Sequence, residues 1–580
     1  MCGIAGFSLN NDIQTAKKLI QQMLDLISHR GPDSSGSSVD ATMALGASRL
    51  SIVDITHGDQ PYTNETGEIT VVFNGEIYND SELRHLLLDS GHHLSSYCDG
   101  DIISHLYEEF GDRFVDKLDG MYAIALWDSA NAKLILVNDP VGIKPLYFTV
   151  ENMNIAFASE IKSLRVLKHQ FDINPLAIGQ YLLYKSIPSP LTPFDGVYKL
   201  CPGEMIVWQP NTPLQKKYID SKSNKSEVDL LSSLQSAVVS TMRGDVDVGC
   251  IVSGGLDSSF IFQVAATSSI KRIPVFAVGY PGTLDDDEVK YAQRICQEFG
   301  GDFNKIIVSP HDIPTTLQDV LWHLDEPIQD PITVPFYLLM RAVKSQVSAV
   351  ITGDGADEIF GGYSRLRHWD RAGSGLSGYS QELTVFSQKD LEEYFLPSIV
   401  PNNETSVTLS RVNSLKTAMR WEMRYRLPSY HLLRVDKLSM AWGVEARVPF
   451  LRRNIVNTAN ALSNDELRHQ GIEKYIFRQS VSSFIPQWLL DRPKKPFTFP
   501  ISGWLRDELA DWVNDTLFSP NALIRDWVNA QFVSSLWNEH RTMVKDNSNQ
   551  LWSLLVLELF LQQNRNANQL WGGGLVNASL

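Results

Sequence analysis

Cysteine is scarce in this 580-residue chain, which holds five in no regular spacing. An odd, irregular set of this kind indicates neither a disulfide framework nor a cysteine-based metal cluster, and it fits a reducing compartment. Long apolar runs are also missing, since none approaches the roughly 18 residues of a membrane span. The opening MCGIAGFSLNND is neither basic nor long enough for a signal peptide. We therefore expect a cytoplasmic protein without a membrane partner.

Positive charge is in deficit as well. Lys and Arg number 51 against 67 Asp and Glu, for a formal net charge of −16. Because nucleic-acid phosphates require patches of Lys and Arg, this balance argues against a nucleic-acid partner. The length exceeds what one hydrophobic core usually organises, so two domains or more are expected.

Short strand-like segments bounded by Gly, Asn, Asp and Pro turns dominate the chain up to about residue 205. Apolar residues at helical spacing interrupt them over 12–28 and 101–110. This pattern predicts an α+β domain over 1–208 with sheets stacked on helices. The polar stretch from Gln209 to Asp229 is predicted to be a linker. The strand-like segments are GIAGFSL, ATMALGASRLSIVD, ITVVFNGEIY, MYAIALWD, KLILVND and NIAFASE.

After this stretch, strands and helices alternate. The strand VDVGCIV runs into the Gly/Ser turn SGGLDSS and a helix, and the strands PVFAVGY, NKIIV and VSAVIT follow with helices between them. Such alternation predicts a parallel, doubly wound sheet. From about residue 366 the pattern is mainly helical. The second domain is therefore predicted over 229–580, as an α/β domain with a largely helical C-terminal part.

A cysteine follows the initiator methionine directly, and it has two interpretations. Cys2 could be a small hydrophobic residue that begins a strand. It could instead be a nucleophile, because removal of Met1 would leave the α-amine of Cys2 free. An α-amine titrates near ~8, so it can take the thiol proton and later return it to departing ammonia. A thiol nucleophile lets amide hydrolysis proceed through a thioester.

Further motifs accompany Cys2 in the first domain: HRGPDSSG at 29–36, SRLSIVD at 48–54, FNGEIYND at 73–80 and CDGD at 98–101. Together they resemble the glutaminase domain of class II glutamine amidotransferases, an N-terminal-nucleophile (Ntn) hydrolase with stacked antiparallel sheets between helices. The resemblance implies that Cys2 is the nucleophile and that the Asn74 side chain and Gly75 N–H form an oxyanion hole. It implies a glutamine site with Arg49 at the carboxylate, Glu76 and Asp99 at the ammonium, and Leu50, Ile52, Val53, Asn74 and Gly75 around them.

Each of these residues taken singly also has a purely structural interpretation. The NG of FNGEIY could form a hairpin turn, Arg49 a surface ion pair and Asp99 a helix cap. Their coincidence with an N-terminal MCGI favours function. Two positions depart from the family's usual pattern, Asp101 in place of Glu and Asn138 in place of Arg, and neither is a chemical group in the implied mechanism.

SGGLDSS at 253–259 lies between a predicted strand and helix, where anions bind at a helix N-terminus. It is not a Walker A loop, because GxxxxGK[ST] is absent, and alone it would be a flexible turn. A second motif, TGDGADEIFGGY at 352–363, ends another predicted strand, and ligands bind at the carboxyl ends of parallel strands. Carboxylates there suit Mg²⁺ together with phosphate oxygens. An acidic turn that caps a helix would account for Glu358 but not for the whole motif.

These two motifs resemble those of ATP pyrophosphatases, which adenylate a carboxylate. With DKLSMAWGVEARVPFL at 436–451 and GIEKYIFRQ at 471–479, nearly the whole chain resembles the glutamine-hydrolysing asparagine synthetase family. The resemblance implies ATP and Mg²⁺ as cofactors, with Asp257 and Asp357 as metal ligands and Asp354 catalytic beside the acyl-adenylate. Lys474 would neutralise pyrophosphate, although a solvated helix lysine is its plainer interpretation. The implied ATP contacts are Ile251, Ser253, Gly254, Gly255, Asp257, Ser258, Val278, Thr352, Gly353 and Lys474.

An enzyme of this family would convert glutamine, aspartate and ATP into asparagine, glutamate, AMP and pyrophosphate. Three departures leave open an alternative, the amidation of another carboxylate in natural-product or surface-polysaccharide synthesis: Arg452 where Asp is usual, Asn304 where His is common, and Pro496 in KKPFTFP. An ATP-dependent cyclase that uses no glutamine, and a non-enzymatic scaffold, are both disfavoured by two complete sets of site residues. A homodimer is expected by family analogy alone.

Overall fold

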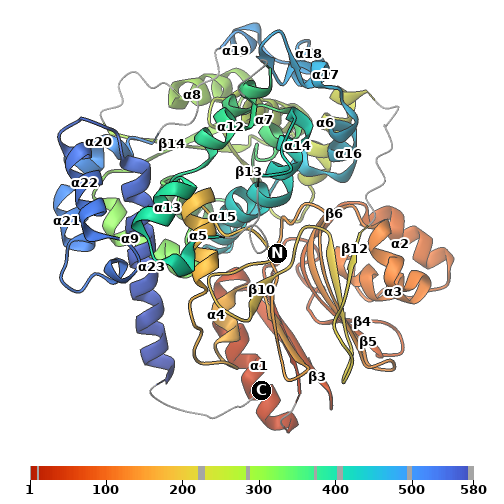
Figure 1. Cartoon of the computed structure of the whole chain (residues 1–580). Helices are drawn as coiled ribbons and strands as arrows, with labels where there is room; N and C mark the ends of the chain where they lie inside the picture. The colour runs from red at the N-terminus through yellow and green to blue at the C-terminus, as the bar shows by residue number, and fades with distance from the viewer. Residues whose placement is uncertain are drawn as a thin grey trace.

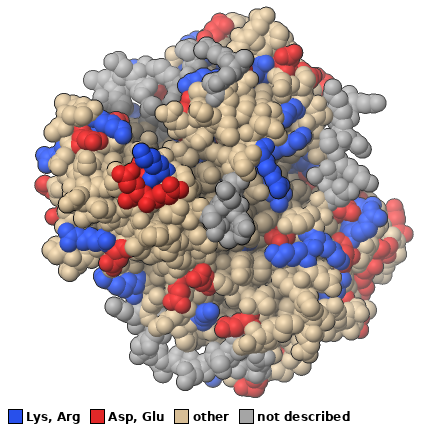
Figure 2. All heavy atoms as spheres, viewed as in Figure 1, with Lys and Arg blue, Asp and Glu red and all other residues tan. Residues whose placement is uncertain are grey.

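The computed structural model describes residues 2–9, 12–219, 229–281, 288–370, 375–401, 409–492 and 499–572, with side chains up to residue 568. Pro496 lies outside these residues, so the expectation about its loop stays a prediction. The N-terminal part, red to yellow, lies below the green to blue C-terminal part in Figure 1. Basic and acidic side chains are interspersed over the face that Figure 2 shows. Within the described ranges, no helix is both long and apolar enough to cross a membrane.

Two antiparallel six-stranded sheets build the N-terminal domain, in the orders β10-β8-β9-β1-β3-β2 and β12-β11-β7-β6-β5-β4. The strands are β1 Cys2–Ser8, β2 Ser34–Val39, β3 Met43–Arg49, β4 Tyr62–Thr63, β5 Ile69–Ile77, β6 Gly120–Asp128, β7 Lys133–Asn138, β8 Tyr147–Glu151, β9 Asn154–Ala158, β10 Val197–Lys199, β11 Glu204–Trp208 and β12 Gln215–Tyr218. The helices are α1 Ile13–Asp25, α2 Asp80–Asp89, α3 Ile102–Phe110, α4 Ile161–Leu164 and α5 Pro175–Tyr184, with short 3₁₀ turns η1 Ser28–Arg30 and η2 Asp99–Asp101.

The strand alternation explains how these layers stack. Ala123 and Ala125 of β6 pack against apolar side chains of the first sheet, such as Ile4 and Leu45. Ile124 between them faces the other way, into a core shared with α2 and α3, because successive side chains of a strand point to opposite faces. Helix α1 covers the outer face of the first sheet. The predicted α+β domain of stacked antiparallel sheets between helices is confirmed.

One part of the sequence-based description needs correction. The polar stretch predicted to be a linker contributes β12, which pairs with β11 in the register Val207↔Gln215. All four residues of β12 are exposed. An edge strand is held by backbone hydrogen bonds along one side, so it needs no apolar side chains and leaves no hydrophobic pattern in the sequence.

A five-stranded sheet in the order β15-β14-β13-β16-β17 forms the centre of the C-terminal domain, and every pairing in it is parallel. The predicted doubly wound sheet is therefore confirmed. Its strand order reverses between β13 and β16, and the crevice at such a reversal is where open α/β sheets bind ligands. The strands are β13 Val248–Ile251, β14 Pro274–Gly279, β15 Asp302–Ile307, β16 Ala349–Ile351 and β17 Glu445–Arg447, with a small hairpin of β18 Arg468–His469 and β19 Ile472–Glu473.

Helices cover this sheet, as expected from the helical pattern after residue 366. The first of them are α6 Leu230–Thr241, α7 Leu256–Ser268, α8 Glu288–Phe299, α9 Asp312–Leu324, α10 Thr333–Lys344, α11 Ala356–Phe360, α12 Gly375–Leu383, α13 Gln388–Tyr394 and α14 Leu415–Trp421. A π-helix, Glu422–Leu432, leads into α15 Leu433–Met440. The others are α16 Arg453–Ala461, α17 Asn464–Leu467, α18 Tyr475–Val481, α19 Gln487–Leu490, α20 Ile501–Arg506, α21 Ala510–Leu517, α22 Ala530–Arg541 and α23 Ser548–Gly572.

Candidate active sites

Cys2 begins β1, which lies inside the first sheet between β9 and β3 and pairs Cys2 with Arg49. The residue is only 4% exposed. Its backbone nitrogen donates to Asn74 Oδ1 at 3.0 Å. The other end of that amide, Asn74 Nδ2, is buried and makes no hydrogen bond within the described part of the chain. An unused donor beside a thiol is what an oxyanion hole requires.

Gly75 follows Asn74 inside β5, opposite Tyr122 of β6. A Cβ at this position would lie 2.1 Å from the Met121 carbonyl oxygen, so only glycine fits. The interpretation of Asn-Gly as a hairpin turn is therefore wrong. These two residues lie in mid-strand, where close approach to β6 explains the glycine.

Gln60 contacts the Cys2 thiol, a role that sequence reasoning missed. Its Nε2 donates to Cys2 Sγ at 3.1 Å and to the Phe73 carbonyl at 2.9 Å, while its Oε1 accepts from the Phe73 N–H at 2.7 Å. Burial raises the pKa of the Cys2 thiol, opposed in part by the Leu50 N–H and the Arg49 guanidinium. The resting thiol is therefore neutral, and a nucleophilic role requires a nearby base.

Arg49 is buried at 4% exposure, and its guanidinium also pairs with the exposed carboxylate of Asp59 at 3.1 Å, so the ion-pair interpretation is confirmed in part. Its guanidinium donates to the Asp54 carbonyl at 2.7 Å and the Val53 carbonyl at 3.2 Å. These bonds hold the loop that carries Leu50, Ile52 and Val53. The Ile52 carbonyl in turn accepts from the Asp245 N–H at 2.8 Å, so the loop is held between the two domains.

Two buried carboxyl groups face one guanidinium at the domain boundary. Arg447 of β17 lies 3.4 Å from Glu76 Oε2 and also pairs with Glu445. Burial, opposed by Arg447, raises the pKa of Glu76 to about 8, whereas Arg447 overcomes burial at Glu445 and lowers its pKa to about 2. Burial also raises the pKa of Asp99, although its Oδ2 accepts the Ile77 N–H at 2.6 Å. Glu76 therefore keeps its proton to a higher pH than an ordinary glutamate does.

The two motifs of the second domain meet at the carboxyl ends of β13 and β16. Ser258 Oγ accepts the Ser253 N–H at 3.1 Å, which closes the loop onto the start of α7. Gly254 has φ +75°, and a Cβ there would lie 2.6 Å from the Glu288 carbonyl. A Cβ on Gly353 would lie 3.2 Å from the Ser258 nitrogen. Ile251 and Val278, both half-buried, lie at the ends of β13 and β14.

Lys474 joins these motifs. Its Nζ lies 2.6 Å from Asp257 Oδ2 and 2.5 Å from Asp357 Oδ1, and the residue is 3% exposed. Burial lowers the pKa of Lys474, but the two carboxylates outweigh burial and raise it. The solvated-lysine interpretation is therefore wrong. Gly362 makes room for the pair, because a Cβ there would lie 2.0 Å from both Asp357 Oδ1 and Lys474 Cε.

The arrangement fits a divalent cation. Asp257 Oδ1 is buried and, within the described part of the chain, has no hydrogen-bond partner, so one carboxylate oxygen beside Lys474 is available. Asp354 lies next to this group, held by a 2.7 Å hydrogen bond from Thr352 Oγ1. Arg434 lies 3.7 Å from Asp354.

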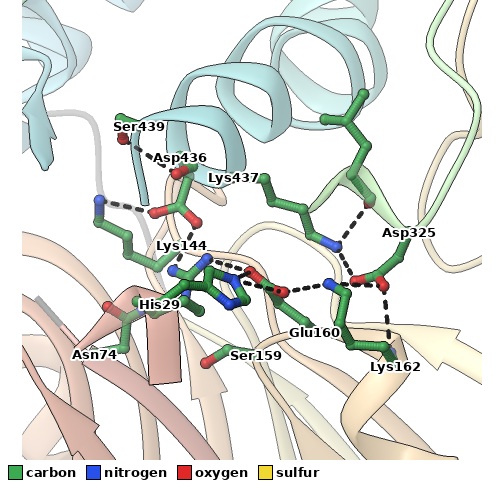
Figure 3. A network of polar contacts seen from close by, with 12 residues as sticks. His29, Asn74, Lys144, Ser159, Glu160, Lys162, Asp325, Asp436, Lys437 and Ser439 are labelled. Atoms are coloured by element: carbon green, nitrogen blue, oxygen red, sulfur yellow. Dashed lines mark hydrogen bonds and ion pairs between the residues drawn. The ribbon is translucent and has the colours of Figure 1, made fainter. Parts of the chain in front are cut away.

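A buried polar network extends from the neighbourhood of Asn74 to Asp436 and Lys437 of α15 (Figure 3). Arg30 Nε donates to the Cys2 carbonyl at 3.3 Å, and its NH2 donates to Asp436 of α15 at 2.8 Å. Arg434, which reaches Asp354, lies on the same helix. The motifs HRGPD and DKLSMA, which are distant in sequence, therefore meet in the structure. The rest of the network is Lys144 with Asp436, His29, Arg30 and Lys162 with Glu160, and Lys162 and Lys437 with Asp325.

The departures from the family pattern have structural contacts. Arg452 NH2 pairs with Asp119 at 2.6 Å, across the domain boundary. Asn304, on β15, accepts from Gln346 Nε2 at 2.8 Å. Asp101 accepts the Ser96 N–H at 2.8 Å within the η2 loop.

The N-terminal domain has stacked antiparallel sheets with a cysteine at the start of an inner strand, and the C-terminal domain has a parallel sheet with a Gly/Ser loop. This combination defines a glutamine amidotransferase joined to a synthetase. Residues 1–219 match the family model of a glutamine amidotransferase domain, and residues 229–562 match that of asparagine synthase. Asparagine synthetase [glutamine-hydrolyzing] 1 of Bacillus subtilis is 30% identical, over 97% of this chain and 96% of that protein. The nodule asparagine synthetase of Pisum sativum is 30% identical, over 89% of this chain and 82% of that protein. The chain belongs to the asparagine synthase family.

Proposed function

We propose that this protein is a glutamine-hydrolysing asparagine synthetase of the cytoplasm, which transfers glutamine-derived ammonia to an aspartyl adenylate. One observation carries the proposal: each site has a buried polar atom that makes no hydrogen bond among the described residues. These atoms are the donor Asn74 Nδ2 beside Cys2 and the acceptor Asp257 Oδ1 beside Lys474. Helix α15 reaches both neighbourhoods, through Asp436 and Arg434. Assembly as a homodimer stays a prediction.

At the first site, the free amine of Cys2 takes the thiol proton, and the thiolate attacks the carboxamide carbon of glutamine. Asn74 Nδ2 and the Gly75 N–H would stabilise the oxyanion that develops. The carbon–nitrogen bond then breaks as the amine returns the proton to the leaving nitrogen. Ammonia departs, and water hydrolyses the thioester to glutamate. Gln60, which donates to Sγ, supports the thiolate.

At the second site, a carboxylate oxygen of aspartate attacks the α-phosphorus of ATP and pyrophosphate leaves. Ser253, Gly254, Gly255 and Ser258 would bind the departing phosphates at the N-terminus of α7, and Lys474 would neutralise their charge. Ammonia then attacks the acyl carbon, AMP leaves, and Asp354 accepts a proton from the attacking nitrogen. Asp257 and Asp357 would hold Mg²⁺, which when bound neutralises charge on phosphate oxygens.

The acceptor is tested by measuring pyrophosphate release and amide formation with ATP, Mg²⁺ and glutamine against a panel of carboxylates. We expect aspartate to support the highest rate. The contacts of Arg452 favour this result over the alternative, because that departure from the family pattern lies at the domain boundary with Asp119. Amide formation with another carboxylate, and none with aspartate, would show that the alternative acceptor is correct.

The raised pKa of Glu76 predicts pH-dependent glutamine binding. An ammonium group pairs with a carboxylate, so the proton of Glu76 must leave before binding. With a pKa of about 8, apparent affinity should rise by about tenfold from pH 6 to pH 7 and less steeply as the pH approaches 8. Calorimetry on a Cys2→Ala variant, which binds without turnover, in two buffers of different ionisation enthalpy should show proton release.

The control for this prediction is Glu68→Gln. Glu68 is an exposed glutamate in the turn before the same strand, so its replacement should leave the pH dependence of glutamine affinity unchanged.

The free energy of unfolding should fall as pH rises, whereas the affinity for glutamine should increase. Because the folded pKa of Glu76 lies above its unfolded value of about 4.5, its stabilising contribution is complete below that value and is lost as pH rises through 8. Affinity that does not vary with pH would contradict the assignment.

A further inference from the structure

A cluster of histidine and glutamate side chains lies apart from both candidate sites, on the outer side of the N-terminal domain. Glu65 is in the turn between β4 and β5, His92 is in the loop after α2, and His105 and Glu108 are on α3. Helices α2 and α3 lie at the right edge of Figure 1, away from α15. His105 and Glu108 are three residues apart, so they share one face of their helix.

The potential ligand atoms of this cluster converge. His92 Nδ1 lies 3.3 Å from Glu65 Oε1, and His105 Nδ1 lies 3.1 Å from Glu65 Oε2. Glu108 Oε2 lies 3.8 Å from each of the two imidazole nitrogens. Ligands at tetrahedral positions about 2.0–2.1 Å from a metal ion are separated from one another by roughly 3.3 Å. The imidazole–carboxylate separations of 3.1–3.8 Å bracket that value, although the two imidazoles approach different oxygens of Glu65. One ligand atom from each of the four residues lies within 4.8 Å of the others.

His105 supplies an independent observation. It is 1% exposed, and neither of its ring nitrogens makes a hydrogen bond among the described residues. A buried ring nitrogen is normally hydrogen-bonded, and Nδ1, although 3.1 Å from Glu65 Oε2, makes no such bond, so the imidazole lacks a hydrogen-bond partner. Its Nδ1 faces Glu65 and Glu108, and coordination of a cation between them would supply that partner.

The second imidazole is oriented in the manner common to metal-bound histidines. His92 Nε2 lies 3.1 Å from Glu109 Oε1, which leaves Nδ1 toward Glu65 and Glu108. A carboxylate that binds the far nitrogen of a ligating histidine holds the ring and raises its basicity. The backbone N–H of His93 also donates to Glu65 Oε1 at 2.7 Å, which steadies the carboxylate.

We propose that Glu65, His92, His105 and Glu108 form a site for a divalent transition-metal ion, with Zn²⁺ as the ion that fits best. Two imidazoles and two carboxylates are ligands that Zn²⁺ accepts, whereas Mg²⁺ and Ca²⁺ prefer oxygen alone. Four protein ligands close the coordination sphere, so the site is structural rather than catalytic.

The ion would join three segments that are distant in sequence: the β4–β5 turn, the loop after α2, and α3. This loop continues into η2, which carries Asp99, one of the residues proposed to contact the glutamine ammonium. Metal binding would therefore stabilise the wall of the proposed glutamine pocket from outside.

The test uses the full-length chain without an affinity tag, freed of metal by a chelator and kept in excess Mg²⁺. Titration with Zn²⁺ in competition with a chromophoric chelator should show one tightly bound equivalent and a rise in Tm. His92→Asn and Glu108→Gln should weaken that equivalent by at least about 100-fold. Co²⁺ in the same site should give the visible absorption of a four-coordinate ion.

His93→Asn is the matched control. It is the neighbouring histidine, its side chain is exposed, and only its backbone contacts Glu65. This variant should bind Zn²⁺ like the wild type. The proposal is wrong if the wild-type chain binds no Zn²⁺ in competition. It is equally wrong if His92→Asn and Glu108→Gln keep the equivalent, because the ion then lies elsewhere, for example on the Cys2 thiol. Circular dichroism checks that both variants remain folded.

Discussion

Replacing Cys2 with alanine should lower glutamine-dependent amide synthesis by at least about 10⁴-fold, while synthesis from ammonium salts continues near the wild-type rate. The thiol is the only proposed nucleophile for the carboxamide, and its site lies in a different domain from Lys474 and Asp257. The measurements are glutamate release and amide formation with each nitrogen donor.

Two comparisons sharpen this experiment. Cys296→Ala, which removes a buried thiol on α8, should retain glutamine use. A chain that retains Met1 should resemble Cys2→Ala, because the base amine is then an amide nitrogen. Glutamine consumption by Cys2→Ala at the wild-type rate would show that the nucleophile lies elsewhere.

Asp257→Asn and Asp357→Asn should each slow pyrophosphate release by at least about 100-fold and leave glutamate release largely intact. Lys474 lies between these two carboxylates, and Asp257 Oδ1 is available to a cation. Asparagine keeps the size of the side chain but removes one negative charge. The substitution therefore weakens metal binding and leaves the charge of the buried Lys474 ammonium incompletely neutralised. Pyrophosphate release should be followed with saturating ATP and aspartate.

Asp247→Asn is the control for this pair. Asp247 precedes β13, pairs with Lys271 at the surface and is well exposed, so its loss should leave both activities unchanged. Thermal unfolding of the three variants separates loss of chemistry from loss of structure. If Asp257→Asn and Asp357→Asn both release pyrophosphate at the wild-type rate, neither residue is a metal ligand.

Much of the architecture was predictable because its signals are local. The alternation of side chains in GMYAIALWD and the helical spacing over 12–28 reflect burial on one or two faces, and each became the expected element, β6 and α1. The same holds for the strands of the parallel sheet up to β16. By contrast, β17 has three residues, and its partner β16 lies almost a hundred residues earlier (Ala349↔Glu445), so no local pattern marks it.

Some residues of the candidate sites could likewise be predicted from local sequence motifs, and others could not. Motifs such as SGGLDSS and FNGEIYND could be recognised because a ligand-binding turn or a close strand approach restricts several adjacent residues at once. Gln60 could not, because its place at the Cys2 thiol depends on how the β4 edge meets β5. The burial of Lys474 between two carboxylates likewise required three separate segments to meet.

The sequence by itself determined the two domains' fold classes and the residue types available for chemistry, since both follow from periodicity and short motifs. Only the tertiary structure decided which charges are buried together. Arg447 lies 371 positions from Glu76 and Arg30 lies 406 positions from Asp436, and each pair meets across the domain boundary. Protonation states at such places depend on desolvation and on the full set of neighbouring charges. These are properties of the packed molecule: burial raises the pKa of Glu76, Arg447 of the second domain opposes the rise, and neither effect has a local pattern in the sequence.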